Sequence, residues 1–246
     1  NKTMYGGTSN PILNARNFET TDGRMSTSLN GVINRCLILL MLVVLSAAFA
    51  WNGQYASPEA LLSKTSLFAI FGLVVAIVTV VKKEWAGYTS PLYAIFEGLV
   101  LGSLSKVFEA QFGGIVFQAV ALTFGTAAGM LLLYKYNIIQ VTNKFRGIVI
   151  TATFAVCMVY LISFIMSFFG HGASFMSSTS PMAMLFQLFV IVIAALNLFL
   201  DFDFITRVSN RGLPSYMGWL AAFGLMVTLV WLYIEILHFL AKLRDR

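Results

Sequence analysis

The stretch Leu37-Ile38-Leu39-Leu40-Met41-Leu42-Val43-Val44 decides the fold class of this chain. Every residue in it is apolar, and the run that contains it, Ile33–Trp51, approaches the about 20 residues that a helix needs to cross a bilayer. A closed β-barrel is the other structure that can cross lipid, but its strands alternate polar and apolar residues. This stretch does not alternate, so it predicts a transmembrane helix.

Similar apolar runs follow along the rest of the chain. The sequence is 59% hydrophobic and only 11% charged, whereas a soluble domain has about 25% charged residues. We therefore predict an all-α integral membrane protein, a bundle of seven transmembrane helices. The expected spans are Ile33–Trp51, Leu61–Val81, Leu92–Val107, Phe112–Tyr134, Gly147–Phe169, Met182–Ile205 and Tyr216–Ala241.

The first part of the chain differs in composition from the rest. Residues 1–31 contain Gly6-Gly7, Asn10-Pro11 and many Ser, Thr and Asn, which is typical of a mobile arm. Residues 32–246 then form a single transmembrane domain. Because a long polar segment precedes the first apolar run, we expect no cleaved leader, and the first helix would direct the chain to the membrane.

The basic residues predict the orientation. A cytoplasmic N-terminus places eleven Lys and Arg on the cytoplasmic side and five on the other, as the positive-inside rule requires. Seven spans then leave the basic tail Lys242–Arg246 outside; the alternative is a re-entrant last segment that returns the tail to the cytoplasm. The net charge of +6 thus indicates topology and lipid contact rather than a nucleic-acid partner.

Small residues inside the spans are interpreted as packing residues. The pairs Gly98/Gly102 and Gly125/Gly129 have the small-xxx-small spacing of close helix contacts. We favour contacts within one monomer over a dimer interface. The two cysteines lie inside apolar runs without the spacing of a disulfide or a zinc site, and no cofactor is expected.

Four acidic residues lie inside or at the edge of the apolar runs: Glu97, Asp201, Asp203 and Glu235. A carboxylate at membrane depth is costly, so each is a candidate functional group. Asp201 and Asp203 are separated by about 200° around a helix and cannot share a face. Arg207 follows Asp203 by four residues, and we expect a structural ion pair between them.

Asp201 has no such cation on its own helix. Asn197 precedes it by one turn on the same face, and its expected partners are Glu235 or the lysines Lys82 and Lys83. Two close carboxylates cannot both be charged at low cost, so the pair would sense pH. When deprotonated, it would attract a cation such as Ca²⁺, which prefers oxygen ligands. The alternative is a permanently protonated structural acid.

The expected distance between the two acids depends on the last helix. They meet only if that helix starts well outside the hydrocarbon, because Glu235 lies far along it. Glu97 either lines the same path or bonds a Ser or Thr on a neighbouring helix. His238 shares the face of Glu235, and we interpret it as a helix-end residue rather than a ligand.

The chain contains five stretches that are specific in combination: Ser9-Asn10-Pro11, Asn30–Asn34, Phe96–Gly102, Leu196–Ile205 and Trp231–Leu237. Together they resemble the Bax inhibitor family of small multi-span membrane proteins, in particular its bacterial YccA-like branch. The resemblance covers almost the whole chain. It implies a seven-helix fold with the last helix central, in the bacterial inner membrane.

The resemblance also implies a pH-sensitive Ca²⁺ leak governed by an acidic pair on the last two helices. By that pattern, Asp201 matches the sixth-helix aspartate and Glu235 takes the place of the seventh-helix aspartate. Lys82 or Lys83 falls where the family has a basic residue that locks the acid in a closed state. Lys in place of Arg removes a bidentate lock, and the linker between the acidic helices is longer here.

The sequence supports three classes of function to different degrees. The leading one is a pH-sensitive cation leak; the alternative is a non-conducting regulator of a membrane-anchored protease or of a stress or cell-death pathway, acting through the N-terminal arm. An enzyme is not expected, because the sequence lacks a Gly-x-Ser-Gly nucleophile motif, a phosphate loop and a metal-ligand cluster. Lys242 is too close to the end of its span for a retinal protein.

Overall fold

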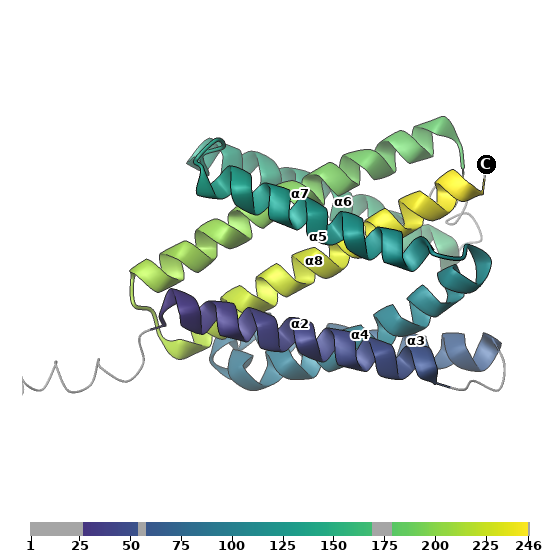
Figure 1. The fold of residues 1–246 in the computed structure, drawn as a ribbon, viewed down its shortest axis with the longest axis horizontal. Coiled ribbons are helices and arrows are strands. Elements are labelled where there is room, and N and C mark those ends of the chain that lie inside the picture. The colour runs from purple at the N-terminus through teal and green to yellow at the C-terminus, as the bar shows by residue number, and fades with distance from the viewer. Residues whose placement is uncertain (1–26, 54–57, 169–178, 246) are drawn as a thin grey trace, which may run out of the picture.

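The computed structural model describes residues 27–53, 58–168 and 179–245. Within these ranges, seven helices are long and apolar enough to cross a membrane, and no strand is present. The predicted all-α bundle of seven spans is thus confirmed (Figure 1). The helices are α2 (Leu29–Asn52), α3 (Pro58–Val81), α4 (Ala86–Gln111), α5 (Ile115–Lys135), α6 (Asn143–Phe168), α7 (Pro181–Asn210) and α8 (Ser215–Arg244), with the 3₁₀ helix η2 (Lys83–Trp85) between α3 and α4.

Helix α4 is longer than its apolar run predicts. It begins at Ala86 rather than Leu92, although Pro91 lies inside it and removes one backbone hydrogen bond. Packing holds this extra segment in place, because Ala86 is fully buried and Gly87 lies against the Trp219 ring of α8. Tertiary contacts therefore extend the helix where the sequence pattern alone would end it.

The turn between α7 and α8 sets the register of the two helices that carry Asp201 and Glu235. α7 ends at Asn210, and Gly212 has φ +58°, the left-handed conformation in which glycine commonly ends a helix. Pro214 then precedes the first residue of α8. The short turn makes α7 and α8 an antiparallel hairpin, so positions equally far from the turn face each other.

Helix α8 is the centre of the bundle. In its most apolar window 61% of the residues are buried, against 11% in α3 and in α6. Figure 1 shows α8 running through the middle of the molecule with the other helices around it. The prediction of a central last helix is confirmed. Because α8 is one continuous helix of 30 residues, about 45 Å long, the alternative of a re-entrant last segment is wrong.

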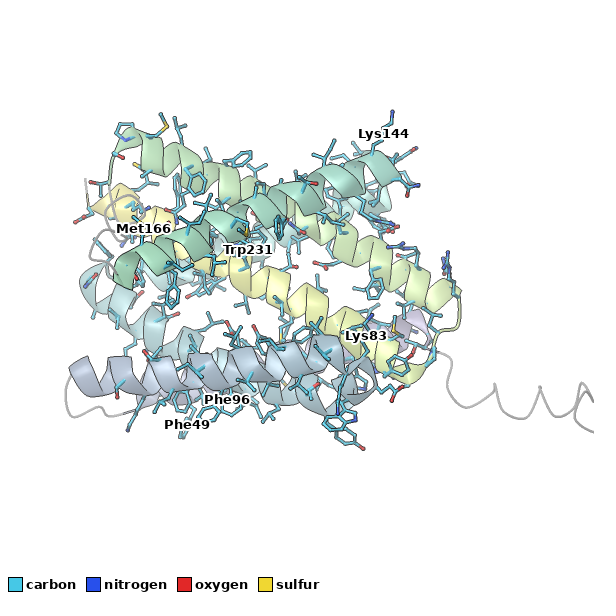
Figure 2. The ribbon with its side chains drawn as sticks, turned by 180° about the vertical axis from the view of Figure 1, so that it is seen from behind. Phe49, Lys83, Phe96, Lys144, Met166 and Trp231 are labelled. Atoms are coloured by element: carbon cyan, nitrogen blue, oxygen red, sulfur yellow. The ribbon has the colours of Figure 1, made fainter. Side chains whose placement is uncertain are left out.

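The two ends of the bundle carry different segments. The start of α2, the turn between α7 and α8, and the turn between α5 and α6 lie at one end, and α8 ends at the other (Figure 1). Lys83 and Lys144 share the first end, while Met166 lies near the second (Figure 2). Most residues of the predicted arm lie outside the described residues, but α2 begins at Leu29, inside the range expected to be arm.

Large apolar side chains cover the outside of the bundle. Phe117, Phe49 and Ile148 are 79%, 76% and 70% exposed, and Figure 2 shows Phe49 at the outer edge of the molecule. A soluble protein rarely exposes large contiguous apolar patches. This surface is suited to the hydrocarbon of a bilayer.

One of the two predicted glycine pairs forms a close helix contact. A Cβ atom on Gly98 would collide with Ser46 Oγ and the Val43 carbonyl, and one on Gly102 would collide with the Ala47 carbonyl. This contact of α4 with α2 confirms packing within the monomer. Gly125 and Gly129 are different, because a Cβ there would have no neighbouring heavy atom of the described residues within 4 Å. The predicted contact is therefore wrong for that pair.

Candidate ion and proton site

Asp201 lies inside α7 and faces α2 and α8. The Thr228 hydroxyl of α8 interacts with its carboxyl group, and a Cβ on Gly224 would lie 3.5 Å from Asp201 Oδ1. Cys36 of α2 lies close enough for its thiol to interact electrostatically with the carboxylate. The second oxygen, Oδ2, is buried without a hydrogen-bond partner in the part of the chain that the structure describes.

No cation neutralises Asp201 among the described residues. The ion pairs found there join Asp203 to two arginines. Lys82 and Lys83, the predicted partners, are exposed in the segment between α3 and α4, where Lys82 Nζ lies 4.5 Å from the Trp85 ring centroid. A carboxylate that is largely shielded from water and has no neighbouring cation is costly when charged. It is therefore suited to bind a proton or an incoming cation.

Glu235 is more deeply buried than Asp201, with 5% of its surface exposed. Its Oε1 accepts hydrogen bonds from Tyr160 Oη of α6 at 2.6 Å and from Trp231 Nε1 at 3.1 Å. Its Oε2 accepts from Gln187 Nε2 of α7 at 3.3 Å. Three neutral donors from three helices thus surround this carboxylate, and no cation among the described residues forms an ion pair with it.

Glu235 borders a cavity of about 340 Å³ between α6, α7 and α8. His238 and Lys242 follow it on α8 at helical spacing and line the same cavity. Gln187 Oε1 is buried and has no hydrogen-bond partner among the residues that the structure describes. The His238 ring contacts Phe108 edge-on at 5.2 Å between centroids. His238 is thus a cavity residue two turns before the end of α8, rather than a helix-end residue.

The structure does not bring Asp201 and Glu235 together. Asp201 faces α8 at Gly224 and Thr228, and Glu235 lies seven residues beyond Thr228, about 10 Å along the helix. On α7, Glu235 bonds Gln187, which is about 21 Å from Asp201 along that helix. The expected approach of the two carboxylates is wrong, because α8 begins directly after a short turn and fixes this register.

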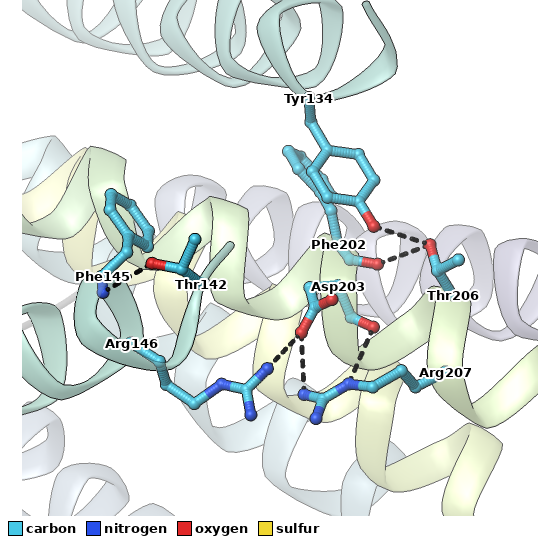
Figure 3. A network of polar contacts seen from close by, with 8 residues as sticks. All are labelled: Tyr134, Thr142, Phe145, Arg146, Phe202, Asp203, Thr206 and Arg207. Carbon is cyan, nitrogen blue, oxygen red and sulfur yellow. Dashed lines mark hydrogen bonds and ion pairs between the residues drawn. The ribbon is translucent and has the colours of Figure 1, made fainter. Parts of the chain in front are cut away.

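Asp203 forms the predicted ion pair. Its Oδ2 lies 2.9 Å from Arg207 Nη2, four residues on, and 2.6 Å from Arg146 Nη2 of α6. Figure 3 shows both guanidinium groups converging on this carboxylate, with Tyr134 and Thr206 hydrogen-bonded nearby. The sequence signal missed Arg146, because a contact between helices leaves no local spacing. Asp203 is therefore a structural acid that joins α6 to α7.

The remaining predicted residues bond elsewhere. Asn197 Nδ2 donates to Thr153 Oγ1 of α6 at 2.7 Å and to the Ile193 carbonyl at 2.9 Å, so it supports the α6–α7 contact. Glu97 hydrogen-bonds Tyr93 on its own helix and faces α3, where a Cβ on Gly72 would lie 3.9 Å from it. Its predicted Ser or Thr partner on a neighbouring helix is replaced by a tyrosine one turn away.

The protein is a membrane bundle of seven helices, with a central last helix and two acids, Asp201 and Glu235, at different depths. The family that matches residues 10–245 is described as Bax inhibitor 1 like. The match spans nearly the whole chain, and the protein belongs to this family. No curated protein matches it.

Proposed function

We propose that the protein is a pH-sensitive cation leak and that Ca²⁺ is the ion it conducts. The observation that carries this proposal is the Asp201 carboxyl group, which lies in the α7–α8 hairpin with its Oδ2 buried and without a hydrogen bond from any described residue. An ionisable group at membrane depth marks an ion or proton path by default. Carboxylate and hydroxyl oxygens, here Asp201 and Thr228, are the ligands that Ca²⁺ prefers.

Glu235 and Asp201 lie at two successive positions along this ion path. Both lie on the α7–α8 hairpin, Glu235 towards the end of α8 and Asp201 closer to the turn. The cavity beside Glu235, with His238 and Lys242, is the entrance. Protonation of Asp201 removes the charge that attracts the cation, so Asp201 sets the pH dependence and Glu235 contributes attraction at the entrance.

The positive-inside rule and the resemblance to the bacterial YccA-like branch supply the proposed location. The N-terminus lies in the cytoplasm, and the membrane is the bacterial inner membrane. The Glu235 cavity then opens towards the opposite side.

Ca²⁺ flux into liposomes that contain the purified protein tests the proposal between about pH 6 and pH 8. Asp201→Asn mimics the protonated acid, so at every pH its flux should equal the flux of the unsubstituted protein at the low-pH end. Glu235→Gln should lower the flux at pH 8 but leave the pH dependence in place.

The control is Glu84→Gln, which removes an exposed acid in η2 and should change neither the size of the flux nor its pH dependence. A pH profile that Asp201→Asn leaves unchanged would remove Asp201 from the mechanism. Folded protein that conducts no Ca²⁺ at any pH would contradict the leak itself.

A further inference from the structure

The cavity between α6, α7 and α8 contains a histidine that the proposed leak does not use. His238 follows Glu235 by three residues on α8, so the two side chains share a face of the helix, and both line the cavity. A Glu-x-x-His pair that projects into a helical bundle is a recurring source of metal ligands. The described residues contain no group of three or more His, Cys, Asp and Glu side chains that could hold a metal ion. The surroundings of the pair therefore decide whether it can bind one.

The imidazole of His238 is held in a defined orientation. One ring N–H donates to the Ile234 carbonyl one turn earlier on α8, and the ring packs edge-on against Phe108. Histidines that bind metals almost always donate their second ring N–H to a carbonyl or a carboxylate, because that bond fixes the tautomer and the direction of the ring. The other nitrogen of the neutral ring then carries the lone pair that a metal ion needs.

The Glu235 carboxylate is anchored through one oxygen. Tyr160 and Trp231 both donate to Oε1, at 2.6 and 3.1 Å. Oε2 accepts the longer bond of 3.3 Å from Gln187 Nε2. Since each carboxylate oxygen has two lone pairs, Oε2 has one left for a metal ion while Oε1 keeps the group in place. Carboxylates that bind metals are typically hydrogen-bonded in this manner.

Gln187 provides an independent observation that points to a ligand. Its side chain lines the same cavity and the residue is only 6% exposed, yet Oε1 has no hydrogen-bond partner among the described residues. A buried acceptor without a donor is rare in folded proteins. A metal ion held by Glu235 and His238 would satisfy this oxygen, directly or through a metal-bound water, and the cavity of about 340 Å³ has room for such waters.

Lys242 is the cation that faces this site. It follows His238 by four residues, lines the cavity and is half-buried. Its ammonium group lies on a long flexible stem that can turn towards the end of the bundle. Because its positive charge opposes a bound cation, removing that charge should strengthen metal binding. Binding elsewhere on the protein would not respond in this way.

The donor atoms decide the class of metal. Ca²⁺ and Mg²⁺ prefer oxygen ligands, whereas an imidazole nitrogen suits Zn²⁺ and other first-row transition metals. Zn²⁺ binds His and Glu together and accepts water in an open position. We propose that Glu235 and His238 bind a transition-metal ion of the Zn²⁺ class in this cavity, completed by Gln187 Oε1 or by water bonded to it. The site shares Glu235 with the proposed leak, but metal binding does not rest on ion conduction.

Isothermal titration calorimetry with Zn²⁺ tests the site on the purified full-length protein, after removal of any affinity tag. The unsubstituted protein should bind Zn²⁺. His238→Asn and Glu235→Gln should each weaken binding about tenfold or more, and Lys242→Gln should tighten it. Lys83→Gln is the matched control, because it removes the same charge at the opposite end of the bundle (Figure 2) and should leave the affinity unchanged.

Two further comparisons identify the ligands. His171→Asn replaces the other histidine of the chain and should retain Zn²⁺ binding. Zn²⁺ should raise the midpoint of thermal unfolding of the unsubstituted protein but not that of His238→Asn, and the same melting curves show that both are folded.

Three results would overturn the assignment. Binding that survives His238→Asn but is lost in His171→Asn would place the metal elsewhere. Displacement of Zn²⁺ by an equal concentration of Ca²⁺ would show that the imidazole is not a ligand. Folded unsubstituted protein that binds no Zn²⁺ would refute the site and leave the proposed leak standing, because calorimetry does not depend on conduction.

Discussion

Two acids only two residues apart have opposite surroundings, because a helix turns their side chains to different faces. Asp203 meets Arg146 and Arg207 at 2.6 and 2.9 Å, while Oδ2 of Asp201 is buried without a hydrogen-bond partner in the described structure. The sequence predicted this difference from the spacing of Asp203 and Arg207 alone. It could not predict Arg146, whose contact joins two helices.

Glu235 shows more clearly that contacts between helices cannot be predicted from sequence spacing. Its donors Tyr160 and Gln187 lie 75 and 48 residues away in the chain, and no periodicity marks them. Only Trp231, four residues before Glu235 on the same helix, is a neighbour that helical spacing could have indicated.

The donors around Glu235 give a prediction for stability. Glu235→Leu would leave the buried Gln187 donor and the half-buried Tyr160 and Trp231 donors without their acceptor, and an unsatisfied buried polar group costs about 1–3 kcal/mol. Glu235→Gln keeps an acceptor oxygen for Tyr160 and Trp231, and the Gln187 amide can turn its free Oε1 towards the new NH₂ group. Thermal unfolding in detergent should therefore show a marked loss for Glu235→Leu and a smaller one for Glu235→Gln. Equal losses would mean that shape, not hydrogen bonding, dominates at this position.

At the scale of elements, the small-xxx-small spacing predicted close contacts but could not say which face meets a partner. Gly98 and Gly102 pack against α2, whereas a Cβ on Gly125 or Gly129 would meet no atom of the described residues within 4 Å. The two pairs have identical spacing, so only the arrangement of the helices separates them. A spacing rule marks where a contact is possible, and the rest of the bundle decides whether it forms.

Replacing glycine with alanine in the two pairs should change the stability of the protein in opposite directions. Gly102→Ala places a Cβ against the Ala47 carbonyl, which must push α2 away from α4, so stability should fall by about 1–3 kcal/mol. Gly125→Ala meets open space and should be neutral or stabilising by about 0.5–1 kcal/mol, because alanine favours a helix over glycine. Thermal unfolding of both variants checks this. A stabilising Gly102→Ala would show that α2 and α4 can separate without cost.

At the scale of the molecule, hydropathy predicted the seven spans, because lipid imposes long apolar runs on the chain, and the resemblance to the Bax inhibitor family implied the central place of α8. Hydropathy could not predict the relative depth of Asp201 and Glu235. That depth depends on the turn at Gly212 and on how much of α8 pairs with α7. A shift of two or three turns changes which acids meet without changing the hydropathy.

The distribution of Lys and Arg also predicts which end of the bundle faces the cytoplasm. Cysteines placed at the two ends of the bundle, in a chain with Cys36→Ala and Cys157→Ala, can be labelled with a thiol reagent that does not cross membranes. Lys83 and Gly113 are exposed positions at the ends of α3 and α4, and a Cβ on Gly113 has open space. Cytoplasmic loops carry an excess of Lys and Arg. Lys83→Cys should therefore react only in inverted vesicles, and Gly113→Cys only from outside intact cells. Reaction of both from one side would contradict the spanning α4, and the reverse pattern would place the N-terminus and the entrance beside Glu235 on the opposite sides from those proposed.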